Sequence, residues 1–325
     1  MTFNLGWGNA VAVRHAFLAG MPKSISFEMN DANLNYTKHE GNAKLIEITK
    51  SVLERQLGHT YQHILLANGA SGAATLVMRA YAQKGYKTAL TRMTPYFPVY
   101  PAMVESAGLI HSDMRYYQQS KKPIALIDSP SNPEGDITDF GALAHTPVIW
   151  DAVYHSNVYT YRKFGPITHD VVVGSYSKLL GLNGLRTGWI ATDDYLLFER
   201  LKNVVSAEYC GLSSASDAIL LEVLKDYKDP KFWDLFEFRA RRNLDSNREE
   251  WSKLERYFAF AIPSNGMFHY TPMDAQCKAL MQKSNIEWTS GHSLGTDDNY
   301  GRFNIGQDCK IVRAAVKEVL KNDRR

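Results

Sequence analysis

Residues 174–189 read GSYSKLLGLNGLRTGW and follow an apolar run, residues 171–173, that is typical of a buried strand. We expect this strand to deliver Lys178 to the edge of a sheet. A partly desolvated lysine near a second cation, here Arg186, has a lowered pKa and can act as an amine nucleophile. The Ser175 hydroxyl and the Arg186 guanidinium suit a phosphate group beside that amine. Taken alone, a lysine after a strand is more often a solvated surface charge, so the remainder of the chain must decide.

Length and composition narrow the class of protein. The chain has 325 residues, which exceeds the usual size of a single hydrophobic core, so two domains are expected. The net charge is +3 and no dense Lys/Arg tract with interleaved aromatics occurs, which argues against a nucleic-acid partner. No apolar run reaches membrane-spanning length, and the three cysteines are too far apart in sequence for a disulfide framework or a metal-ligand cluster. We therefore expect a cytoplasmic protein with no metal site and no membrane or nucleic-acid partner.

Short β-rich apolar runs alternate with longer helical patterns through the first two thirds of the chain. The candidate strands are Ile64–Ala67, Lys87–Thr91, Ile124–Asp128, Val148–Asp151, Val171–Ser175 and Gly188–Thr192, and the candidate helices between them are Ser71–Gln83 and Pro98–Ala107. This alternation predicts βαβ units and an α/β fold with a mostly parallel sheet covered on both faces. Sheets of this kind bind ligands at the carboxyl ends of their strands.

The last third of the chain has a different pattern. One long, charged helix is expected from Phe232 to Phe258, with Glu237, Arg241, Asp245 and Arg248 on its exposed face. Short strands near Met267–Thr271 and Arg302–Ile305 and a helix from Lys310 to Leu320 then predict a smaller α+β unit. We therefore divide the chain into an N-terminal arm (1–35), a large ligand-binding domain (36–235) and a small C-terminal domain (236–325). The arm shows no clear periodicity and is expected to pack on the small domain.

Two further segments have features of a binding site: one can bind an anion, and the other holds an asparagine side chain in a fixed position. Residues 68–73, Asn-Gly-Ala-Ser-Gly-Ala, lie between a strand and a helix, where free N–H groups and the helix dipole favour a phosphate. Residues 128–135, DSPSNPEG, place Asn132 before a proline at a strand end. Tight packing and a simple turn are the structural alternatives for these two segments.

Three other positions suit a flat, charged ligand. Asp151 ends a buried strand and therefore needs a cation or a hydrogen-bond donor, and Tyr154 follows three residues later. An aromatic side chain from residues 94–100 can stack on a ring. Arg302 opens an apolar strand, and its guanidinium suits a carboxylate. A capping aspartate, core aromatics and a surface arginine are the alternatives.

The order and spacing of these segments are more specific than any one of them. Asn132 precedes Asp151 by 19 residues, Lys178 follows Asp151 by 27, and Arg302 closes the set. The pattern, which begins at Tyr36-x4-Gly41-x3-Leu45, resembles the fold type I pyridoxal-phosphate enzymes, specifically the class I/II aminotransferase group. The stretch from Asp151 to Trp189 is also similar to the tryptophan aminotransferase and alliinase branch. However, His155-Ser156 stand where that branch carries another aromatic residue and a Trp-Pro, so we do not carry its substrate over.

The resemblance implies the fold of the pyridoxal-phosphate-dependent transferases and pyridoxal 5′-phosphate as cofactor. Lys178 would form the Schiff base and then act as the base that moves the proton. Asp151 would pair with the pyridinium nitrogen, and Asn132 and Tyr154 would hydrogen-bond the 3-oxygen of the ring. The remaining implied cofactor contacts are Gly69, Ala70, Ser71, Ser175 and Arg186 at the phosphate, and Phe97 on the ring with Tyr96 as the alternative.

The resemblance also implies amino acid and 2-oxo acid substrates and a homodimer. Arg302 would bind the substrate α-carboxylate, with Asn132 and the backbone of Trp7 and Gly8 as further contacts. Tyr36 would reach the phosphate in the neighbouring subunit. No second arginine can be assigned to a distal carboxylate, which favours a neutral, aromatic or unusual amino acid.

Three rival functions follow from the same residues. A decarboxylase or lyase uses the same cofactor scaffold, although Arg302 favours retention of the carboxylate and hence transamination. A binding or regulatory protein that keeps the fold without catalysis is the second rival. The presence of Lys178, Asp151, Tyr154 and Arg186 together argues against it, because such a protein could lose these residues. A nicotinamide enzyme is disfavoured because no Gly-x-Gly-x-x-Gly with a downstream acid is present.

Overall fold

The central element of the fold is a seven-stranded sheet in the order β2-β8-β7-β6-β5-β3-β4. The computed structural model describes residues 2–26, 28–30, 35–138, 146–160, 171–209 and 211–323. The strands are β2 (His63–Asn68), β3 (Thr88–Thr91), β4 (Ile110–Asp113), β5 (Pro123–Asp128), β6 (Val148–Asp151), β7 (Val171–Ser175) and β8 (Thr187–Thr192). Strand β8 runs antiparallel to β2 and β7, and all other neighbouring pairs are parallel. The predicted α/β fold with a mostly parallel sheet is confirmed.

Both faces of this sheet are buried because successive strand residues enter different hydrophobic clusters. In β2, Leu65 and Ala67 belong to the cluster formed with helices α4 (Gly69–Gln83), α5 (Tyr100–Ser106) and α7 (Tyr195–Glu208). Ile64 and Leu66 belong to the opposite cluster, with α1 (Val11–Leu18), α3 (Ala43–Leu57) and α8 (Ser214–Val223). Alternation of side chains along a strand produces this two-sided core.

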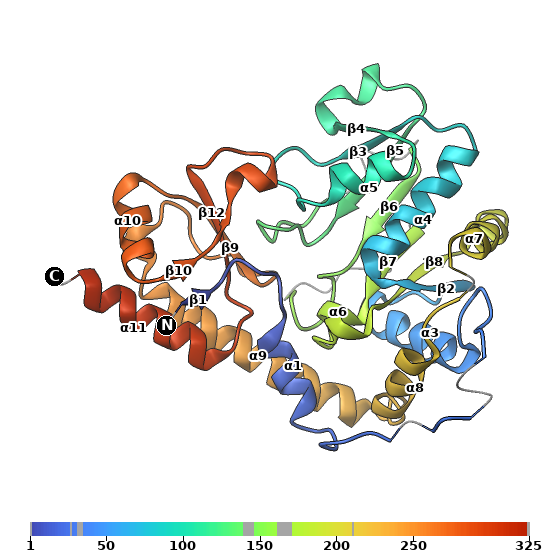
Figure 1. Ribbon diagram of the computed structural model, residues 1–325, viewed down its shortest axis with the longest axis horizontal. Helices are drawn as coiled ribbons and strands as arrows, with labels where there is room; N and C mark the ends of the chain where they lie inside the picture. Colours follow the sequence, from blue (N-terminus) through green and yellow to red (C-terminus); the bar gives the residue numbers. More distant parts are fainter. Residues whose placement is uncertain are drawn as a thin grey trace.

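A second, smaller sheet has the order β11-β12-β9 and is antiparallel. Its strands are β9 (Phe268–Pro272), β11 (Thr289–Ser290) and β12 (Tyr300–Asn304). Phe303 of β12 packs in a third hydrophobic cluster with residues of helices α10 (Ala275–Lys283) and α11 (Cys309–Asp323). Strand β1 (Phe3–Asn4) pairs in parallel with β10 (Ile286–Glu287), so the start of the chain lies against this smaller unit (Figure 1). The short remaining elements are α6 (Tyr176–Leu179), η1 (Met114–Gln119), η3 (Asn183–Leu185), η4 (Glu255–Tyr257) and η5 (Gly291–Leu294).

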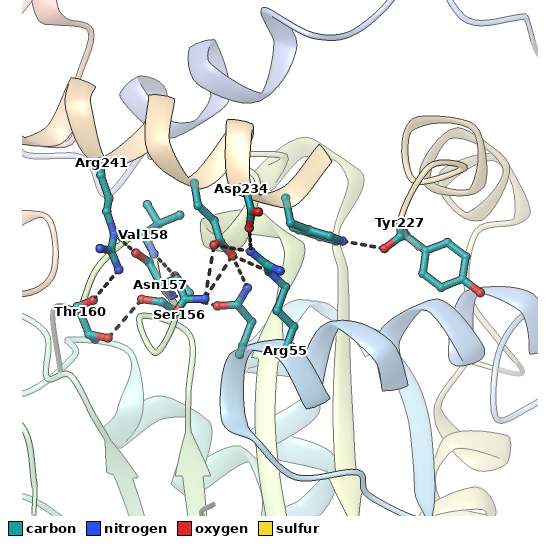
Figure 2. Close-up of polar contacts among 11 residues, drawn as sticks. Arg55, Ser156, Asn157, Val158, Thr160, Tyr227, Asp234 and Arg241 are labelled. Atoms are coloured by element: carbon teal, nitrogen blue, oxygen red, sulfur yellow. Dashed lines mark hydrogen bonds and ion pairs between the residues drawn. The ribbon is translucent and has the colours of Figure 1, made fainter. Parts of the chain in front are cut away.

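The long helix α9 (Pro230–Ser252) extends from beside α8 to beside α11 (Figure 1). Trp233 and Phe236 in its first turns pack in the cluster with α1 and α3, whereas Trp251 in its last turn packs in the cluster of the smaller sheet. The sequence predicted such a helix, although it ends six residues before the expected Phe258. Figure 2 shows that its first half is tied by polar contacts to α3 and to the segment after β6.

The expected exposed face of α9 is wrong at Glu237. This residue is only 8% exposed, because its carboxylate accepts hydrogen bonds from Arg55 at 2.8 and 3.1 Å and from Gln56 at 2.9 Å. On the same helix, Arg241 donates to the carbonyl oxygens of Asn157 and Thr160 (Figure 2). These contacts fix the backbone that follows Tyr154. None of the helices in the described ranges is long and apolar enough to span a membrane.

Candidate active site

A cavity of about 310 Å³ lies at the carboxyl ends of the central parallel strands. Asp128, Asp151 and Ser175, which end β5, β6 and β7, line one side of it. The other sides are formed by the first turn of α4, the N-terminal segment, the segment after β7 and the smaller sheet. The residues from these parts are Ala70, Ser71, Gly8, Asn9, Lys178, Arg186, Phe268 and Arg302. The cavity therefore collects side chains that are far apart in sequence.

Lys178 projects from α6, which begins immediately after β7. Ser175 caps this helix, because its hydroxyl oxygen accepts a hydrogen bond from the Ser177 N–H at 2.9 Å. The Lys178 amine donates to the carbonyl oxygen of Gly8 in the N-terminal segment. Burial, followed by the positive charges of Arg302 and Arg186, lowers the pKa of Lys178 from 10.5 to about 8, and Asp151 opposes this shift. The lysine expected from the sequence is thus partly buried and lines the cavity, which excludes the surface alternative.

Asp151 lies at the end of β6 and is 8% exposed. Its Oδ2 accepts a hydrogen bond from the Tyr100 hydroxyl at 3.0 Å, and its Oδ1 accepts one from the Val153 N–H at 3.1 Å. Burial raises the pKa of Asp151 to about 6, against the lowering effect of these donors and of Lys178. Tyr100 was not predicted as a site residue, since nothing in the segment 94–100 distinguishes a ring that stacks from a hydroxyl that donates.

A phosphate-sized anion would find its donors at the start of α4. Ala70 and Ser71 in the first turn of this 15-residue helix line the cavity, where its free N–H groups and dipole favour negative charge. Gly69 has φ +71°, and a Cβ there would lie 2.6 Å from Nη2 of Arg186. Arg186 itself adopts a left-handed backbone conformation with φ +53°, which is uncommon for a residue other than glycine. Its guanidinium lies next to this helix end.

The aromatic and amide residues expected from the sequence also reach the cavity. Phe97, Asn132 and Tyr154 line it, whereas Tyr96 does not and packs edge-on against His111 with ring centroids 5.5 Å apart. Burial raises the pKa of Tyr154, so its hydroxyl keeps its proton at neutral pH. Phe268, which sequence reasoning missed, packs edge-on against Tyr154 at 5.8 Å between ring centroids.

Arg302 lies on β12 and reaches the cavity from the smaller sheet. Its Nη1 donates to Oδ1 of Asn132 at 2.9 Å, and its Nη2 donates to the Gly6 carbonyl oxygen at 2.9 Å and to Oγ1 of Thr289 at 3.1 Å. The guanidinium lies 4.3 Å from the centroid of the Phe268 ring, a cation–π contact. Its Nε is buried and has no hydrogen-bond partner within the described ranges.

Three expected site residues do not line the cavity: Gly69, which is buried beside it at the start of α4, and Trp7 and Tyr36. Trp7 is 70% exposed and Tyr36 is 92% exposed, and neither contributes to the lining. The backbone of Trp7 is nevertheless fixed at the cavity rim, because its carbonyl oxygen accepts a hydrogen bond from Asn304 at 2.6 Å. The role of Tyr36 in a neighbouring subunit stays a prediction.

The family description "Aminotransferase class I and II" matches residues 4–319 of this chain. The chain belongs to the class I and II aminotransferases. Among curated relatives of this family, tryptophan aminotransferase-related protein 1 of Oryza sativa subsp. japonica is 25% identical over 291 residues, covering 78% of this chain and 63% of the relative. Aspartate aminotransferase of Pyrococcus abyssi is 23% identical over 243 residues, covering 65% of this chain and 61% of that protein. The chain thus spans less than two thirds of the length of both relatives.

Solved aminotransferase structures share the fold. The aromatic aminotransferase from Pyrococcus horikoshii OT3 superimposes with a TM-score of 0.77 at 17% identity, covering 99% of this chain and 96% of that chain. A single mutant of Thermus thermophilus aspartate aminotransferase gives a TM-score of 0.79 at 15% identity, with 99% and 91% covered. The predicted PLP-dependent transferase fold is confirmed.

The cofactor of class I and II aminotransferases is pyridoxal 5′-phosphate, and the residues of the cavity fit it. The fit rests on three features of this chain: a partly buried amine of lowered pKa, a buried carboxylate with hydrogen-bond donors, and a helix N-terminus flanked by an arginine. Gly69 allows Arg186 to lie close to this helix end, since a Cβ at this position would lie 2.6 Å from its Nη2 and the guanidinium would have to shift.

Proposed function

We propose that this protein is a pyridoxal-phosphate-dependent aminotransferase that moves an amino group between an amino acid and a 2-oxo acid. When bound, the cofactor supplies an aldehyde to which amines add and a ring that withdraws electrons. The observation that carries the proposal is the presence of Lys178, Asp151 and Arg302 around one cavity. Lys178 would provide the attacking amine and then accept the proton from the substrate Cα, because its lowered pKa leaves part of the amine neutral near pH 7.

The other residues would bind and orient. Asp151 would hold a proton on the ring nitrogen, while Asn132 and Tyr154 would hydrogen-bond the 3-oxygen and Phe97 would stack on the ring. The α4 N-terminus with Arg186 would bind the phosphate. These assignments agree with the position of each residue in the lining of the cavity.

Arg302 would bind the α-carboxylate of the substrate. Its contacts with Asn132 and Gly6 fix the guanidinium before any ligand arrives, which reduces the entropy lost on binding. Retention of the carboxylate favours transamination over decarboxylation. No arginine other than Arg186 and Arg302 lines the described part of the cavity, which supports an amino acid with a neutral or aromatic side chain.

The proposed assembly is a homodimer in the cytoplasm. The high exposure of Tyr36 and Trp7 in one chain is consistent with coverage by a second copy. The division into an arm, a large domain and a small domain with boundaries at 35/36 and 235/236 stays part of the same proposal.

The test is incubation of the purified, cofactor-loaded protein with a panel of amino acids and a 2-oxo acid acceptor. The proposal expects a new 2-oxo acid and the aminated acceptor in equal amounts, and no product with Lys178→Ala. Release of carbon dioxide from the same amino acid would instead assign the decarboxylase function. A cofactor-loaded protein that gives neither product across the panel would overturn the proposal.

A further inference from the structure

A second carboxyl group lies next to Asp151 at the bottom of the same cavity. Asp128 and Asp151 are register partners at the ends of the parallel strands β5 and β6. Adjacent strands are about 4.8 Å apart, so directly paired side chains on one face are neighbours. Both carboxyl groups line the cavity and therefore share that face.

Asp128 is only partly satisfied by hydrogen bonds. Its side chain is 3% exposed, and its Oδ2 accepts a hydrogen bond from the Asn132 N–H at 2.7 Å. Its Oδ1 is buried and has no partner in the part of the chain that the structure describes. Asp151, in contrast, uses both oxygens, with Tyr100 and Val153 as donors. An ionised Asp128 would thus be a buried charge with an unmet acceptor, which is costly, whereas a protonated Asp128 turns one oxygen into a donor.

The charged groups around Asp128 do not remove this cost. Arg92, which follows β3, favours the ionised form, but its Nη2 binds Glu134 at 2.9 Å and Asp136 at 3.4 Å, and its buried Nη1 donates to no group in the described ranges, Asp128 included. Asp151 on β6 opposes ionisation, and Glu134, Tyr100 and Tyr154 are the other titratable groups that interact with Asp128. Burial dominates and raises the pKa of Asp128 to about 7, above that of Asp151.

We propose that Asp128 and Asp151 share one proton at neutral pH, with the proton on Asp128, so that this end of the cavity carries a single negative charge. One negative charge matches one protonated ring nitrogen, whereas two would leave a buried carboxylate without a counter-ion. Asp128 is therefore a positioning residue: by holding the proton it lets Asp151 stay ionised, so that Asp151 alone pairs with the ring nitrogen. The proton-sharing pair itself does not depend on the proposed function; only its match to the ring does.

The first test is a ¹³C NMR titration of the protein without cofactor, labelled at aspartate Cγ and assigned with Asp128→Asn and Asp151→Asn. We expect two apparent steps for the pair in the wild type, because interacting carboxyl groups titrate together. In Asp128→Asn the upper step disappears and the lower one remains. Asp113→Asn, at the end of β4 and outside the cavity lining, serves as control and leaves both steps in place. A wild-type Asp128 signal that titrates near its ordinary value of 3.8 overturns the proposal.

The second test measures binding of pyridoxamine 5′-phosphate, which carries an amine in place of the aldehyde and so forms no bond with Lys178. We expect Asp128→Asn, which resembles the protonated acid, to weaken binding less than about threefold, and Asp151→Asn to weaken it at least about tenfold. Equal losses for the two variants contradict a neutral Asp128. If the wild type fails to bind pyridoxamine 5′-phosphate, the proposed function fails, and the titration alone decides the shared proton. If Asp128→Asn does not fold, the wild-type titration still decides it.

Discussion

The reactivity of Lys178 should depend on pH in a way that the cavity dictates. The difference between its ordinary pKa of 10.5 and its value of about 8 corresponds to about 3 kcal/mol of preference for the neutral amine. At pH 7 about one amine in ten is then neutral, against about one in three thousand for an exposed lysine, a gain on the order of 300-fold in the reactive form. The largest cause of the lowered pKa of Lys178 is burial of the amine, followed by the positive charges of the neighbouring Arg302 and Arg186.

The assay is the rate at which pyridoxal 5′-phosphate combines covalently with the cofactor-free protein, followed by absorbance from pH 6 to 10. We expect the rate to rise with pH and to level off above a midpoint near 8. Arg302→Gln removes one of the two cations and should move this midpoint upward by ~0.5–1 pH unit. Arg79→Gln, which removes a cation from α4 outside the cavity lining, is the matched control and should leave the midpoint unchanged. A midpoint near 10.5 in the wild type would refute the reasoning, because it would mean that the amine titrates as if exposed.

Two further substitutions test the two ends of the cavity. Gly69→Ala forces a side chain into a left-handed conformation and against Arg186, and should weaken binding of pyridoxal 5′-phosphate at least about tenfold in a fluorescence titration. Gly184→Ala, where no atom lies within 4 Å of the added Cβ, is its control, and equal affinity of both variants would contradict a tight phosphate site. Tyr100→Phe removes a donor from Asp151 and should raise the pKa of that carboxyl and weaken binding of pyridoxamine 5′-phosphate by on the order of tenfold. An unchanged affinity in the same titration would show that this hydrogen bond does not matter to the ligand.

The sequence predicted the central strands well where burial is continuous. Residues 148–151 and 171–175 form β6 and β7 with the expected bounds, because strands buried on both faces are uninterrupted apolar runs. Strand β4, Ile110–Asp113, was missed, since this edge strand carries His, Ser and Asp and is only partly buried. Helix α1 was missed as well, because its eight residues are too few to show a period.

Tertiary contacts explain the remaining differences. The sequence places Glu237 on a polar face of α9, but only the fold brings Arg55 and Gln56 to it and buries it. The pairing of Asp128 with Asp151 depends on strand register, which no spacing along the chain reveals. By contrast, Lys178, Asp151 and Arg302 were predicted together, because their order and spacing along the chain resemble those of the class I/II aminotransferase group.

The most direct test of the central claim is to locate the covalent bond between cofactor and protein. The protein loaded with pyridoxal 5′-phosphate is reduced with borohydride, digested and analysed by mass spectrometry. Our account predicts that the added mass lies on Lys178 alone, at one cofactor per chain, and that Lys178→Ala carries none. A reduced cofactor attached to another lysine, with Lys178 unmodified, would contradict it.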